Sequence, residues 1–278
     1  MSNILEAIVN IVENKDYEIK EYTSGSNRTQ NMGEALEQYI LDAYCNSFKV
    51  IDNDERLLKH QQIFSFLGSK SKLPDAIVRG AEALEIKKSS QSTVQLNSSS
   101  PKHTLKAENK RVASSAKICE DEAWSEKEMI YCFGYIPDNA NQLKSVWFVY
   151  GRVFCDLPEV YEGTANKIES NLEDLQNDDT ETNELGRINN VDNLKITYLR
   201  VRGMWVIQHP QKVFSKLTKG WGKNDFEVKA IIPKSIFDGL PEKSKNRLKS
   251  SSLNIDEIEL PDPTNRARNI ECLFIYYK

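Results

Sequence analysis

Short apolar stretches separated by polar turns run along most of this chain and predict a mixture of strands and helices. Residues 73–78 are apolar with β-branched side chains, residues 79–82 have turn composition, and residues 83–88 alternate between apolar and polar. We therefore expect a β-hairpin over 73–88. Further elements are expected as core strands at 129–135, 146–154, 226–232 and 270–277, and as helices at 3–14, 32–44 and 160–176.

The helix predicted at 32–44 has a single apolar face. Its apolar residues recur at helical spacing and make the stripe that should be buried, which consists of Leu36, Tyr39, Ile40 and Ala43. A polar stretch, 24–31, leads into this helix. Asn27 and Arg28 in that stretch could hold a phosphate at the helix entrance, and a plain capping loop explains them as well.

Three charged residues lie on the predicted hairpin. Asp75 follows a proline that fits the start of the first strand, because a proline there has no N–H to give to a ladder. Glu85 and Lys87 lie two apart on the second strand, so they share one face while Leu84 and Ile86 point to the other, toward a core. The hairpin therefore predicts that Asp75, Glu85 and Lys87 converge on one patch.

Two carboxylates and an amine in this arrangement suit a divalent metal at a phosphodiester. Magnesium prefers oxygen ligands, so Asp75 and Glu85 could coordinate it together with the Ile86 carbonyl, while Lys87 orients a water and neutralises charge on the phosphate. In-line attack would leave a 5′-phosphate and a 3′-hydroxyl. A salt-bridged surface hairpin is the alternative explanation of the same residues.

These residues resemble a known family. Pro74-Asp75 with Glu85-Ile86-Lys87 matches the core motif of PD-(D/E)xK nucleases, and Gly33 with Glu37 is similar to their first-helix Gly-x-x-x-Glu pattern. Three further stretches, 83–88, 96–102 and 198–205, occur in the order seen in the NgoPII-type group of type II restriction endonucleases, which they resemble. The similarity extends from about residue 27 to about residue 213.

The resemblance implies an α/β fold with a PD-(D/E)xK restriction-endonuclease-like core, in which helices flank a mixed β-sheet. It also implies a type II restriction endonuclease that needs Mg²⁺ to cut both strands of DNA at a short palindrome, GGCC being the target of the group's namesake. It places Glu37 beside the metal as an accessory ligand or an orienter of water, with a solvated surface glutamate as the alternative. Two other functions remain open, a DNA-binding protein without catalysis and a structure-specific repair nuclease.

Charge along the chain is polarised, although the net charge is only −4. Residues 156–184 contain ten acids against one base, Lys167, so the helix expected at 160–176 should be an acidic one that faces solvent. Residues 195–223 contain seven bases and no acid. A basic stretch of this kind can dominate DNA affinity through counterion release, even in an acidic protein.

Two segments are candidates for DNA contacts. The polar run 89–100 is expected to be a loop along the DNA groove, or alternatively a flexible linker, and it offers Gln95, Asn97, Ser98 and Ser99 as hydrogen-bonding groups, with Lys102 in the basic stretch that follows. Arg200 and Arg202 share one face of a strand expected at 196–205 and could read guanine, contact phosphate or form structural salt bridges. Residues 204–207 are expected in the core.

The remaining features of the sequence limit the class of protein to which the chain can belong. The five cysteines have no Cys-x-x-Cys spacing, which favours reduced thiols over zinc or disulfides, and no stretch is apolar enough to predict a membrane span or a signal peptide, so a cytoplasmic protein is expected. We expect one domain over 1–278, with a catalytic core at about 27–155 and recognition elements at about 188–278. A palindromic site implies a homodimer, for which Trp124, Trp147 and residues 274–277 offer aromatic interface material.

Overall fold

The computed structural model describes residues 2–19, 28–68, 72–97, 99–118, 123–138, 140–171, 185–188, 191–218 and 226–277, with backbone alone at 28–31, 97 and 187. Two of the predicted DNA-binding residues, Asn27 and Ser98, lie outside this part of the chain, as do the side chains of Arg28 and Asn97. No helix among the described residues is long and apolar enough to cross a lipid bilayer.

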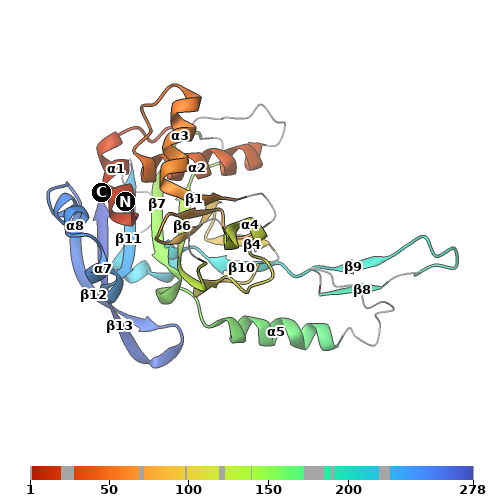
Figure 1. Cartoon of the computed structure of the whole chain (residues 1–278). Coiled ribbons are helices and arrows are strands. Elements are labelled where there is room, and N and C mark those ends of the chain that lie inside the picture. The colour runs from red at the N-terminus through yellow and green to blue at the C-terminus, as the bar shows by residue number, and fades with distance from the viewer. Residues whose placement is uncertain are drawn as a thin grey trace.

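Nine strands of the described chain form one mixed sheet, which is the α/β architecture predicted from the sequence (Figure 1). Eight of them follow the spatial order β1 (Phe64–Leu67), β2 (Ala76–Val78), β3 (Ala83–Ser89), β6 (Glu126–Tyr135), β7 (Ser145–Tyr150), β11 (Glu227–Pro233), β13 (Asn265–Tyr277) and β12 (Asn254–Asp262). The ninth, β5 (Thr104–Lys106), pairs with β6. Strands β3 and β6 are parallel, as are β7 and β11, and every other pair in the sheet is antiparallel.

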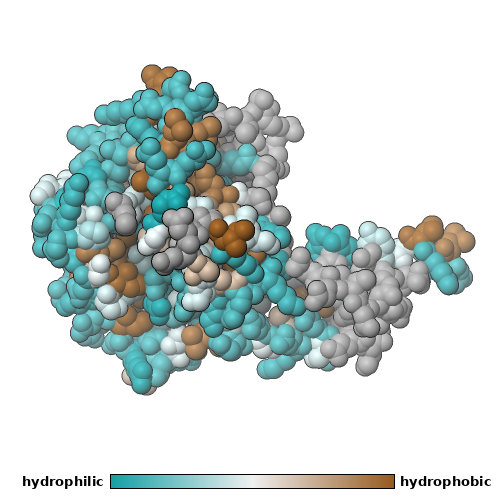
Figure 2. All heavy atoms as spheres, viewed as in Figure 1, coloured by the Kyte–Doolittle hydropathy of each residue, from teal (hydrophilic) through white to brown (hydrophobic). Residues whose placement is uncertain are grey.

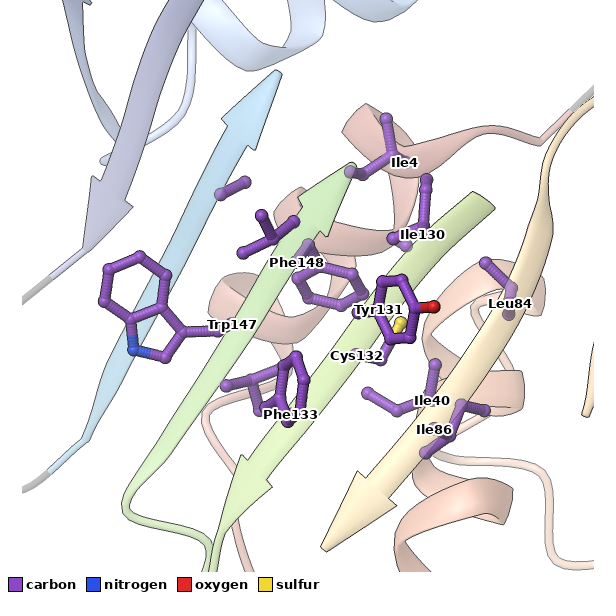
Figure 3. Close-up of a cluster of buried hydrophobic side chains, with 14 of the residues drawn as sticks. Ile4, Ile40, Leu84, Ile86, Ile130, Tyr131, Cys132, Phe133, Trp147 and Phe148 are labelled. Atoms are coloured by element: carbon purple, nitrogen blue, oxygen red, sulfur yellow. The ribbon is translucent and has the colours of Figure 1, made fainter. Parts of the chain in front are cut away.

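Two helices from the N-terminal part of the chain pack against the sheet. Helix α1 (Ile4–Asn14) begins at Asn3, whose side chain accepts hydrogen bonds from the first-turn amides, and helix α2 (Arg28–Cys45) buries the stripe predicted for it. Figure 3 shows Ile4 of α1 and Ile40 of α2 against Ile130 and Cys132 of β6. The sequence predicted these helices because their apolar residues recur at helical spacing.

Aromatic side chains of β6 and β7 form a layer on the other face of the sheet, opposite the face that α1 and α2 cover. Tyr131 and Phe133 both pack against Phe154, with ring centroids 5.9 and 5.7 Å apart, and Trp147 stacks on Phe214 at 6.2 Å. Trp147 is fully buried, and the C-terminal residues Phe274 and Ile275 are buried too. The expectation that these three residues supply a dimer interface is therefore wrong, because they fill the core of a single chain, whereas the half-buried Trp124, Tyr276 and Tyr277 stay predictions.

The smaller elements surround the sheet. The helices are α3 (Asn53–Ile63), α4 (Ser114–Lys117), α5 (Pro158–Ser170), α6 (Pro210–Val213), α7 (Lys234–Gly239) and α8 (Glu242–Lys249), and the 3₁₀ turns are Gly151–Val153 and Ser215–Leu217. Strands β4 (Thr93–Asn97) and β10 (Trp205–Gln208) form one antiparallel pair, and β8 (Gly186–Ile188) and β9 (Leu199–Val201) form another. Figure 1 shows that β8 and β9 project from the body as a long arm.

The structure corrects the expectation for residues 89–100, which contain a strand where a loop or a flexible linker was expected. Val94 and Leu96 of β4 are 5% and 4% exposed, whereas Gln95 between them is exposed. The alternation of a half-buried strand is present in the sequence, but the many serines around it suggest a loop. Pairing with β10 is what orders this segment.

Residues 204–207 are not uniformly in the core, as had been expected. Trp205 and Ile207 pack against the core, whereas Met204 and Val206 are 59% and 54% exposed. Because β10 belongs to a two-stranded sheet, only one of its faces is covered, and alternate residues of the strand face solvent.

Candidate active site

Asp75 lies immediately before β2, and its side chain accepts a hydrogen bond from β3 that a strand carbonyl would otherwise accept. The Asp75 amide donates to the Leu84 carbonyl at 3.0 Å, but the next amide of β3, that of Ile86, donates to Asp75 Oδ2 at 2.6 Å. The Asp75 carbonyl accepts a hydrogen bond from Gly68 at 2.7 Å. The Asp75 backbone is thus fixed on both sides, and its carboxylate is held against β3 by the Ile86 amide.

The three charged residues of the hairpin meet as the sequence predicted. Lys87 Nζ lies 2.6 Å from Glu85 Oε1 and 3.3 Å from Asp75 Oδ2. The Glu85 side chain is only 7% exposed, whereas those of Asp75 and Lys87 are 22% and 20% exposed. The hairpin is salt-bridged, as the alternative explanation held, but it is not wholly a surface feature, because the Glu85 carboxylate is buried while the Asp75 and Lys87 side chains are partly exposed.

Burial and mutual repulsion shift the ionisation of this cluster. Burial, and then the neighbouring charge of Asp75, raise the pKa of Glu85 to about 7. Burial on its own lowers the pKa of Lys87, but the adjacent carboxylates of Glu85 and Asp75 outweigh it and raise that pKa above its usual value. Glu37 of α2 belongs to the same field, because burial and then Asp75 raise its pKa to about 7. The cluster therefore holds more negative charge than one lysine can neutralise.

The donor atoms fit a divalent cation. Within the described chain, Glu85 Oε2 is buried and has no hydrogen-bond partner, although a buried carboxylate oxygen normally has one. Oxygen donors and excess negative charge are what a hard cation such as Mg²⁺ requires. No group of three or more histidine, cysteine, aspartate or glutamate side chains among the described residues is arranged to hold a metal, so Glu37 does not form a three-carboxylate set with Asp75 and Glu85.

Lys102 lies close to this cluster, through a contact that sequence reasoning missed. The Lys102 amide donates to the Tyr131 hydroxyl at 2.6 Å, and Tyr131 of β6 pairs in register with Glu85 of β3. Lys102 Nζ donates to Ser100 Oγ at 2.6 Å, and burial lowers the pKa of this lysine. No local pattern marks Tyr131, because its role depends on the pairing of two strands that are distant in sequence.

A cleft of about 530 Å³ adjoins Lys102. One wall is basic, with Lys102, Lys106, Lys110 and Arg111, and α5 forms another wall with its acids Glu159, Glu162 and Glu169. The prediction of an acidic helix that faces solvent is confirmed, since no residue of α5 is buried, and these three acids also border the cleft opposite its basic wall. The exposed apolar side chains of this helix lie elsewhere on its surface, at Val160 and Ile168.

The predicted DNA-binding residues fall into two groups. Gln95 is exposed on β4, and the Ser99 amide closes a turn onto the Leu96 carbonyl at 3.2 Å, which places both near the end of the β4–β10 sheet. Arg200 and Arg202 are exposed on the arm, at β9 and just after it. Their contacts with DNA stay predictions, as does the catalytic role of each hairpin residue.

Comparisons with known proteins agree with the geometry. The sequence model of the NgoPII restriction endonuclease family matches residues 2–261. The type II restriction enzyme NgoPII of Neisseria gonorrhoeae is 35% identical over 280 residues, a match that covers 99% of each chain. No solved structure gives a significant match. The chain therefore belongs to the NgoPII restriction endonuclease family and is a type II restriction endonuclease, a site-specific deoxyribonuclease.

Proposed function

We propose that this enzyme hydrolyses both strands of DNA at a short palindrome with Mg²⁺ held by Asp75 and Glu85. The observation that supports this most directly is the meeting of Asp75, Glu85 and Lys87 around a buried Glu85 oxygen that has no hydrogen-bond partner in the described chain. A bound Mg²⁺ supplies Lewis-acid polarisation of the scissile phosphate and lowers the pKa of water.

The side chains around this position would divide the remaining work. Lys87 orients the attacking water and offsets the negative charge that builds on the phosphate, since its ammonium lies within reach of both carboxylates. Glu37, with its pKa raised to about 7, is suited to orient the water and take up a proton. Lys102 would hold a phosphate oxygen beside the cleft. In-line displacement then leaves a 5′-phosphate and a 3′-hydroxyl.

Target reading would come from elements outside this cluster. We assign it to Arg200 and Arg202, which suit guanine, together with Gln95, Asn97, Ser98 and Ser99, while Asn27 and Arg28 contact the backbone. The target would be GGCC, by analogy with the namesake of the family. A two-fold site fits a homodimer with one active site for each strand, acting on double-stranded DNA in the cytoplasm.

Plasmid digestion tests this proposal. With Mg²⁺ the protein should give discrete fragments whose sequenced ends show one palindrome, and chelation by EDTA should stop the reaction. Asp75→Asn should lose cleavage but keep gel-shift affinity, because the basic surfaces persist. Asp54→Asn, an exposed carboxylate of α3, is the matched control and should cut normally. Full cleavage by the Asp75 variant would refute the assignment of the metal ligands.

A further inference from the structure

The arm, defined here as the described residues between 185 and 204, exposes apolar side chains that the rest of the described chain leaves largely uncovered. Leu194 and Ile196 at its tip are 77% and 75% exposed, and Val191 and Leu199 are 58% and 54% exposed. Figure 2 shows this apolar group at the far end of the arm, away from the body. Soluble proteins seldom expose a contiguous apolar patch unless it is an interaction site.

The tip of the arm is a built structure that presents these side chains. The Val191 amide donates to the Thr197 carbonyl at 3.0 Å, and the Asp192 side chain accepts from the Leu194 amide at 2.9 Å. Lys195 adopts a left-handed conformation with φ of 58° and donates its amide to the Asp192 carbonyl at 2.9 Å. The turn thus directs Leu194 and Ile196 outward in a defined geometry.

The arm has little within its own chain to hold it in place. Strands β8 and β9 pair only with each other among the described strands, and an isolated two-stranded hairpin is marginally stable in water. Directly after the arm, Trp205 of β10 packs edge to face on Tyr161 of α5, with ring centroids 5.6 Å apart. The tip extends past the end of that helix (Figure 1). A stable position for the tip therefore requires a second molecule.

Helix α5 offers an apolar surface that the arm of another copy could cover. Leu157, Val160 and Ile168 are 43%, 52% and 45% exposed, and their spacing of three and eight residues places them on one side of the helix. This side adjoins the one that lines the cleft, because Ile168 follows the cleft residue Tyr161 by seven residues and so lies on the same stripe of the helix. Within one chain the tip cannot reach this surface, because it lies beyond the end of the helix.

We propose that the arm is an exchanged dimerisation element, with the tip of each copy packed on the apolar side of α5 of the other copy. The inference rests on the proposed function, since cutting both strands of a palindrome calls for two active sites related by two-fold symmetry. Arm and α5 together give each copy the roughly 20–30 residues that a stable interface uses on each side. Because each copy gives its arm to the other and receives the arm of the other, two copies satisfy all of these contacts and no further copy can add.

Sedimentation velocity on the full chain without DNA tests the proposal. At micromolar concentration, the wild-type protein should sediment as a single species whose mass is twice the chain mass of 31.9 kDa. The double variant Leu194→Ser with Ile196→Ser should dissociate, with a dimer dissociation constant raised about 100-fold or more, because four apolar side chains leave the interface. Val160→Ser with Ile168→Ser should have the same effect from the other side.

The matched control replaces two leucines of similar exposure on α3, Leu57 and Leu58, which are 53% and 58% exposed. Leu57→Ser with Leu58→Ser should remain dimeric and keep the wild-type melting temperature. The two variants that dissociate should still unfold cooperatively, at a temperature lowered only by the loss of dimer stabilisation. A wild-type monomer, or a dimer that survives either the arm or the α5 variant, would overturn the proposal. A dimeric arm variant with weakened DNA binding would show instead that the tip contacts DNA.

The cleavage assay separates this proposal from the proposed function. Asp75→Asn should stay dimeric while losing activity, and the arm variant should nick supercoiled plasmid to the open circle before linearising it. If the wild-type protein is dimeric, the arm and α5 variants dissociate and the wild-type enzyme does not cut, the proposed active site fails while the arm assignment stands. If the wild-type enzyme cuts and the arm variant remains dimeric, the arm assignment fails alone.

Discussion

Replacing Glu37 by glutamine should stabilise the metal-free protein at pH 8 and leave its stability nearly unchanged at pH 4. Burial, and then the neighbouring carboxylate of Asp75, raise the pKa of Glu37 from 4.5 to about 7, and Glu34 and Glu85 add to the repulsion. The folded protein therefore disfavours the charged form of Glu37. Glutamine has nearly the same shape and carries no charge, so the variant removes the repulsion and little else.

The sign and size of the effect follow from proton binding. At pH 4 the carboxyl is mostly protonated in both the folded and the unfolded chain. Between pH 4.5 and about 7 the folded state keeps a proton that the unfolded chain has released, so the free energy of unfolding falls as pH rises. A pKa difference from 4.5 to about 7 corresponds to ~3 kcal/mol. Partial solvent screening reduces the expected gain for the variant to ~2 kcal/mol at pH 8.

Urea unfolding in EDTA at pH 4 and at pH 8 measures this difference. Glu55→Gln, an exposed carboxylate on α3, is the control and should show no comparable dependence on pH. Magnesium should shrink the gain at pH 8, because a cation at Asp75 and Glu85 removes much of the negative field around Glu37. An equal change in unfolding free energy at both pH values would refute the reasoning, since it would show that Glu37 ionises freely in the folded protein.

Three further substitutions test other parts of the structure. Gly68→Ala should cost about 2 kcal/mol and slow cleavage at least tenfold, measured by urea unfolding and plasmid digestion, because the added Cβ would clash with the Pro74 carbonyl oxygen and meet the Asp75 carbonyl oxygen at 2.9 Å; unchanged values would show that the loop yields freely. Asp42→Asn should cost ~3–5 kcal/mol, since it leaves the buried Arg56 guanidinium without the carboxylate it contacts at 2.6 and 2.7 Å, and a fall in melting temperature of only a degree would contradict this. Arg200→Ala should reduce discrimination between cognate and altered sites by ~1–3 kcal/mol in competition binding, whereas equal weakening on every sequence would identify a phosphate contact.

The geometry of the hairpin that carries Asp75, Glu85 and Lys87 was predictable because its information is local. Asp75, Glu85 and Lys87 lie within one pair of adjacent strands, and strand alternation alone places Glu85 and Lys87 on one face. The observed contacts among the three confirm that geometry. Glu37 was placed near them only through the resemblance to a known family, because no local rule connects a helix residue to a distant strand.

The parts that sequence reasoning missed depend on tertiary pairing. Tyr131 holds the Lys102 backbone beside Glu85 only because β3 and β6 run parallel in one register. Strand β4 was taken for a loop because its partner, β10, is more than a hundred residues away in the sequence. The exposure of Val206 has the same origin, since the number of layers over a strand cannot be read from that strand alone.

The position of β11 has a consequence for how the enzyme is made. All six residues of β7 are buried, and β11, which covers its outer edge, lies in the last quarter of the chain. While the ribosome is still translating the middle of the message, β7 therefore presents an apolar edge with no neighbour. The central sheet therefore gains its β7–β11 pairing only after residues 227–233 have been made, and the unpaired edge of β7 is open to wrong pairing until then.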